Sequence, residues 1–271
     1  SLISYGDLRR YNTIIFPSGT PDINNYSKEI LINWVKQGGT LIANNRSTRL
    51  LASDNEFGDV KLLHQTFEDT KSYNIDLMRE IYSLDNNLNK NDVNSNRVNF
   101  EINYPWESSD KTYSKDQLEM RDKWQSLLMP SGSMVSARSD QQHWLTFGTE
   151  DLIPILYANN PILMTGGNSE APIRIGELIQ NDDVEESRMI NWSQVPKGYD
   201  LNVRMSGLVW PEASQRIANS AYLTREKIGK GQIILFSGEP NFRGSARGTN
   251  RLWLNAVIYG SGLGTDTLVT Q

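Results

Sequence analysis

The hydrophobic pattern of the first 60 residues alternates between short apolar runs and amphipathic segments. Residues 14–16 and 40–43 are apolar runs typical of buried strands. Between them, apolar residues at helical spacing predict a helix that Ser27 caps and that Gly38 and Gly39 end. A further helix is expected within residues 47–52. Strands that alternate with helices predict a parallel sheet covered on both faces.

The C-terminal third repeats this strand, loop and helix arrangement. Residues 221–228 and 232–236 flank a glycine-containing turn at 229–231, which is a hairpin signal. A polar loop and a helix follow the second of these strands, so its carboxyl end is where functional groups would be presented. Further extended segments are expected in four places: residues 143–147, 153–157, 161–164 and 201–210.

The middle of the chain has a different character. Residues 68–82 and 114–128 have helical patterns, and residues 86–103 are rich in asparagine and poor in apolar residues. Because this region lacks the apolar residues for a core of its own, we interpret residues 65–135 as a helical insertion. The whole chain, 1–271, is then one α/β domain.

The amino-acid composition argues against several classes of function. The net charge is -5 and no basic face is evident, which argues against a nucleic-acid partner. No apolar run is long enough to span a membrane. The absence of cysteine excludes disulfides, thiolate metal sites and cysteine nucleophiles.

Several segments resemble the C-terminal region of bacterial zinc carboxypeptidases. In those proteins a carboxypeptidase A-like catalytic domain is followed by a domain similar to class I glutamine amidotransferases. The resemblance implies a three-layer, flavodoxin-like α/β fold with a parallel sheet, a helical insertion and some antiparallel strands. The segments that carry it are residues 11–19, 143–148, 206–212, 217–222, 229–244 and 250–256.

The family's zinc site needs a His-x-x-Glu pair and a later histidine. This chain has only His64 and His143, and Phe67 and Thr146 stand where the glutamate would be. We therefore expect no metal or cofactor in this chain. The resemblance implies that zinc belongs to an upstream carboxypeptidase domain, which would be the partner together with its peptide substrate. It also implies a secreted or periplasmic protein.

An active glutamine amidotransferase carries its cysteine on a strained turn between a strand and a helix. In the matching turn, Asn44, Asn45 or Arg46 occupies that position. We expect Ser47 to cap the following helix rather than to act as a nucleophile, and His143 to be structural. No catalytic residue is therefore assigned.

Polar and aromatic residues around the expected strand ends are candidates for binding. Arg243 could clamp a carboxylate or pair with Glu212 or Glu239. Trp210 could form a ligand shelf or pack at a domain interface. Residues 182–186 are expected to form a solvated acidic loop rather than a calcium site. The candidate binding residues are Asn44, Asn45, Arg46, Trp210, Glu212, Asn241 and Arg243.

The main functional interpretation is a non-catalytic accessory domain that supports peptide hydrolysis by an upstream domain. One alternative is an active amidase or hydrolase with a serine or carboxylate nucleophile in a rebuilt site, in which Ser47 would need His64 or His143 as its base. A second is a peptide- or carbohydrate-binding module, supported by aromatic residues that could stack on a sugar: Tyr104, Trp106, Trp144 and Trp192.

Overall fold

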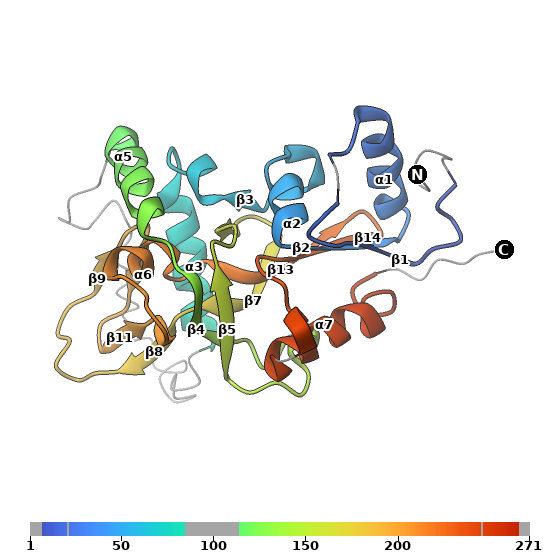
Figure 1. Ribbon diagram of the computed structural model, residues 1–271. Coiled ribbons are helices and arrows are strands. Elements are labelled where there is room, and N and C mark those ends of the chain that lie inside the picture. The colour runs from blue at the N-terminus through green and yellow to red at the C-terminus, as the bar shows by residue number, and fades with distance from the viewer. Residues whose placement is uncertain (1–6, 21, 85–113, 245, 266–271) are drawn as a thin grey trace, which may run out of the picture.

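A ten-stranded mixed sheet organises the computed structural model, which describes residues 7–20, 22–84, 114–244 and 246–265 (Figure 1). The strands of this sheet are β1 (Thr13–Phe16), β2 (Thr40–Asn44), β3 (Lys61–Leu62), β4 (Ser131–Ser139), β5 (Leu152–Ala158), β6 (Leu163–Met164), β7 (Ser169–Ile175), β12 (Arg204–Ser206), β13 (Ala221–Ile228) and β14 (Gly231–Phe236). Two ribbons lie beside it: β8 (Glu177–Gln180) with β11 (Tyr199–Asn202), and β9 (Arg188–Ile190) with β10 (Ser193–Val195).

The helices come from both halves of the chain. They are α1 (Asn25–Lys36), α2 (Asn45–Ala52), α3 (Thr70–Leu84), α5 (Lys115–Gln125), α6 (Pro211–Ile217) and α7 (Arg247–Tyr259). Short 3-10 turns are η2 (Asn55–Phe57), η3 (Leu63–Gln65), η4 (Ser126–Leu128), η5 (Trp144–Thr146) and η6 (Phe242–Gly244).

Among the described strands, parallel ladders join three strands at one end of the sheet, whose main path runs β1-β2-β14-β13-β7-β4-β12, and one isolated parallel bridge joins Ala137 to Gly176. β2 pairs in parallel with β1 and with β14, so that Leu41 lies opposite Ile233. β14 then turns back on β13 in the hairpin predicted at Gly229, whose φ is 62°. From β13 to β12 every pairing along the path is antiparallel. The chain is an α/β protein, and its sheet is mixed.

Helices cover both faces of the parallel strands. Leu41 and Ile233 point to a hydrophobic cluster that includes residues of α1 and α2. Their neighbours Ile42 and Ile234 belong to the cluster that contains Leu252 of α7. Figure 1 shows the same arrangement, with α1 and α2 on one side of β2 and α7 on the other. Burial on both faces explains why these strands are continuous apolar runs in the sequence.

The helical patterns predicted for the middle of the chain are confirmed in α3 and α5. Leu77, Met78 and Leu118 from these helices belong to the same cluster as Leu252. The asparagine-rich residues 86–103, together with Tyr104 and Trp106, lie outside the described residues. Among the helices that the structure describes, none has the length and apolar character needed to cross a bilayer.

Three local predictions were wrong. The α1 cap is Asn24, whose Oδ1 accepts from the Ser27 backbone N–H at 2.8 Å, while Ser27 is buried inside the helix. Residues 143–147 are a 3-10 turn instead of a strand, because His143 Nδ1 accepts from the Leu145 N–H at 3.1 Å and caps it. The strand predicted over residues 201–210 is two short strands, β11 and β12, followed by the start of α6.

Candidate functional site

The sharp bend between β2 and α2 is present as predicted. Asn44 ends β2 in an extended conformation, and Asn45 begins α2 with a φ of 45°. This left-handed backbone is uncommon for residues other than glycine, although asparagine tolerates it better than most. The residue at the strained strand-to-helix position, where an amidotransferase would carry its cysteine, is therefore an asparagine.

Ser47 has a structural role that differs from the one predicted. It lies inside α2, is only 1% exposed, and donates its hydroxyl to the Pro17 carbonyl oxygen. The cap position belongs to Asn44, so the prediction that Ser47 caps the helix was wrong. Thr48 donates in the same way to the Phe236 carbonyl oxygen at 2.8 Å. These two hydroxyls tie α2 to the chain at the ends of β1 and β14.

Neither histidine is placed to activate Ser47. Both ring nitrogens of His143 are engaged: Nδ1 accepts from the Leu145 N–H, and Nε2 lies 3.1 Å from Glu170 Oε2. The hydrogen bond with His143 lowers the pKa of Glu170. His64 is exposed on η3. In the part of the chain that the structure describes, no hydrogen bond joins Ser47 to either histidine.

The polar loop after β14 begins at the same edge of the sheet as the Asn44–Arg46 turn, since Asn44 lies opposite Phe236. Asn241 and Arg243 are exposed in this loop, and the Arg243 guanidinium carbon lies 5.2 Å from the centroid of the Phe242 ring. The predicted pairing of Arg243 with Glu212 or Glu239 was wrong. Within the described residues, Arg243 makes no ion pair with either carboxylate.

The remaining predicted residues belong to another element. Trp210 and Glu212 open α6, a helix that packs against α5, and Trp210 is 50% exposed. Thus the structure brings residues 44–46 and the loop after β14 to one edge of the sheet. Trp210 and Glu212 lie apart from them on α6. Arg46 is exposed on the first turn of α2.

Two buried polar atoms lack partners at this edge. Asn44 Oδ1 and the Ser237 hydroxyl are buried and have no hydrogen-bond partner. They stand at the ends of the adjacent strands β2 and β14. The edge therefore keeps a polar interior, which includes one hydroxyl without a partner among the described residues.

Other candidates have structural roles. The acidic residues of the 182–186 loop are exposed, and no group of three or more metal-ligating side chains is found among the described residues. Trp192 is buried and Trp144 packs against the core, with its ring stacked on His143. Neither offers the open aromatic face on which the sugar-binding alternative depends.

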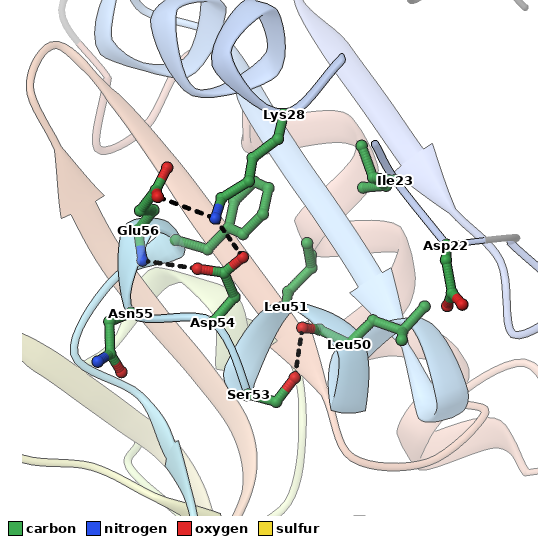
Figure 2. Close-up of a pocket in the computed structure, with 10 residues that line it drawn as sticks. Asp22, Ile23, Lys28, Leu50, Leu51, Ser53, Asp54, Asn55 and Glu56 are labelled. Carbon is green, nitrogen blue, oxygen red and sulfur yellow. Dashed lines mark hydrogen bonds and ion pairs between the residues drawn. The ribbon is translucent and has the colours of Figure 1, made fainter. Parts of the chain in front are cut away.

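A hollow of about 570 Å³ lies between α1, α2 and η2 (Figure 2). Figure 2 shows Lys28 reaching from α1 toward two carboxylates, and its Nζ lies 2.5 Å from Asp54 and 3.0 Å from Glu56. The hydrogen bond with Asp54 raises the pKa of Lys28. Because Lys28, Asp54 and Glu56 already pair with one another, we interpret them as a structural contact that holds α1 against η2.

A second hollow, of about 370 Å³, lies between α3 and β7. Its lining includes the His143–Glu170 pair and the ion pair between Arg174 and Glu80. These charged side chains therefore pair with one another in this hollow, as they do in the first.

A third hollow, of about 290 Å³, is lined by a cation, Arg49, that makes no ion pair with any described residue. Arg49 from α2, His64 from η3 and Arg216 from α6 line it together. Neither arginine was predicted as a site residue, because no motif or spacing in the sequence connects α2 with α6. Only the folded chain brings them to one place.

Comparison with known proteins does not assign a family. No family model matches the chain, and no curated protein matches it. Among solved structures, it is similar to the cytoplasmic protein STM3548 from Salmonella typhimurium, at 10% sequence identity and a TM-score of 0.40. That alignment covers 95% of this chain and 74% of the other. A likeness at this level carries no argument about function, so the α/β class rests on the sheet and its helices.

Proposed function

We propose that this chain is a non-catalytic, glutamine amidotransferase-like accessory domain of a bacterial zinc carboxypeptidase-like protein. The observation that carries the proposal is the bend between β2 and α2. It keeps the strained geometry that suits a nucleophile, yet Asn45 offers an amide there and the Ser47 hydroxyl is bound to Pro17. An amide at Asn45 and a Ser47 hydroxyl that is already bonded support a binding or packing role for this bend rather than a catalytic one.

The wider parts of the proposal come from the sequence resemblance. The domain would pack on an upstream catalytic domain and support peptide hydrolysis there, with zinc held by that domain alone. The complete protein would be secreted or periplasmic. Helices on both faces of β2 and β14 agree with the three-layer architecture of such domains.

The first test concerns catalysis by this chain. We expect the purified chain not to hydrolyse glutamine or simple amides, because no base touches Ser47. Ser47→Ala should then change only stability, by about 1 kcal/mol for one lost hydrogen bond. The matched control is Ser53→Ala, an exposed hydroxyl at the end of the same helix. Turnover that disappears in Ser47→Ala and persists in Ser53→Ala would contradict the proposal.

The second test concerns the partner. We expect the coding sequence upstream of Ser1 to encode a carboxypeptidase domain with a His-x-x-Glu motif. Removing residues 8–265 from the complete protein should then lower peptide hydrolysis or the thermal stability of the catalytic domain. An upstream region without that motif, or a catalytic domain unaffected by the deletion, would refute the accessory role.

A further inference from the structure

The third hollow combines cations with an apolar wall. Leu62, Leu63, Pro161 and Ile162 form the wall, and Arg49, His64 and Arg216 supply the basic groups. None of the described residues that line it is acidic, although the chain as a whole has a net charge of -5. The hollow thus gathers three basic side chains on an acidic protein, and one of them, Arg216, already pairs with Asp122.

Arg216 is held in a fixed orientation. Its Nε lies 2.7 Å from Asp122 Oδ1 and its Nη2 lies 3.2 Å from Asp122 Oδ2. This two-point contact uses one side of the guanidinium group. Within the described residues its Nη1 has no hydrogen-bond partner. A guanidinium group that the protein already orients loses less conformational entropy when it binds a ligand.

Arg49 is exposed, and among the described residues its side chain has no hydrogen bond or ion pair. Arg49 and Arg216 both line the hollow, and so does Asn160, whose carbonyl oxygen accepts from the buried Tyr157 hydroxyl at 3.1 Å. Burial raises the pKa of Tyr157, and the positive charges of Arg216 and Arg49 oppose that rise. Both cations therefore belong to the lining of one hollow.

We propose that this hollow binds a carboxylate that carries an apolar substituent, such as the C-terminal residue of a peptide. The two guanidinium groups bind the carboxylate through charge-assisted hydrogen bonds, and the apolar wall contacts the substituent. Inorganic phosphate could use the same cations but would leave the wall unused. This binding site goes beyond the proposed accessory role, because it needs no upstream domain.

The test is isothermal titration of the purified chain with the peptide Ala-Ala-Leu. We expect the peptide with a free C-terminal carboxylate to bind saturably and its C-terminal amide to bind at least about tenfold more weakly, since the amide lacks the charge. Arg49→Gln should weaken binding of the free acid about tenfold, the effect of one lost charge-assisted hydrogen bond. Arg247→Gln, an exposed position on α7 outside the hollow, is the matched control and should leave binding unchanged.

Four results would overturn the proposal: no binding of the free acid at millimolar concentration, equal binding of acid and amide, binding of inorganic phosphate alone, or unchanged binding in Arg49→Gln. Because Arg49 is exposed, circular dichroism should show the Arg49→Gln variant folded, so a loss of affinity reports on the site. These measurements use only this chain, so their failure differs from the discovery of an upstream region without a carboxypeptidase motif.

Discussion

The ion pair between Arg174 and Glu80 fastens α3 to the sheet and allows a quantitative test of the packing. The Arg174 Nε lies 2.7 and 2.8 Å from the two carboxylate oxygens of Glu80, and its Nη2 lies 2.7 Å from Oε2. Arg174 is only 4% exposed, whereas the Glu80 side chain is 27% exposed. Glu80→Gln leaves the arginine buried without its counter-charge.

We expect this substitution to lower the free energy of unfolding by about 2–3 kcal/mol. Breaking a fully buried pair costs about 3–5 kcal/mol, and the partial exposure of Glu80 reduces that figure because water screens the charge. The assay is urea unfolding followed by tryptophan fluorescence, in which the midpoint should fall while the m-value stays constant.

Two further variants test whether the loss of stability comes from the Arg174–Glu80 ion pair. Glu29→Gln, at an exposed position on α1, should change stability by less than about 0.5 kcal/mol. The double variant Glu80→Leu with Arg174→Met should recover part of the loss, since apolar residues often replace a buried pair at little cost, although it also removes the hydrogen bonds from Arg174 to the Asn219 carbonyl oxygen and the Thr165 hydroxyl. A change below about 0.5 kcal/mol in Glu80→Gln, or a double variant no more stable than the single one, would refute this account.

Three other predictions test separate parts of the fold. Gly231→Ala would place a Cβ 2.1 Å from the Val35 carbonyl oxygen, so thermal unfolding should show a loss of at least about 2 kcal/mol; a wild-type melting temperature would contradict this. Leu252→Ala should cost about 3–5 kcal/mol because Leu252 is fully buried, whereas Leu254→Ala on the same helix, 47% exposed, should cost under about 1 kcal/mol in urea unfolding. The pKa of Glu170 is lowered from 4.5, so its stabilising effect is present above that pH and is lost as pH falls through its folded pKa. The stability difference between wild type and Glu170→Gln should therefore shrink below about pH 4.5, and a constant difference would contradict the assignment.

The local pattern of hydrophobic and turn-forming residues predicted those elements that depend only on neighbours in the sequence. The bend after Ala43 and the hairpin at Gly229 follow from apolar runs that end in small or polar residues, and both are present. Residues 143–147 misled the prediction because their strand propensity is overridden by a side chain: the imidazole of His143 caps a turn. Such a cap depends on one hydrogen bond that no periodicity records.

Long-range arrangement was the part that sequence could not supply. The switch from parallel to antiparallel pairing after β14 depends on which strand pairs with which, and hydrophobic patterns do not encode partners. The same limit hid the basic hollow, because Arg49 and Arg216 each look like ordinary surface arginines of short helices. For Arg243 the sequence suggested either a carboxylate clamp or an ion pair with Glu212 or Glu239, and the contact with the Phe242 ring that the structure shows was not predicted.

The pairing of β2 with β14 has a consequence for how the chain reaches its native state. Gln232 and Thr40 are partners in this ladder although they are separated by 192 positions. During synthesis, β2 must wait for all the residues between it and β14 to emerge before this neighbour arrives. Closing so long a loop is slow, and during that delay the apolar face of β2 is open to aggregation. Refolding that is slow and requires low protein concentration is the expected cost of this topology.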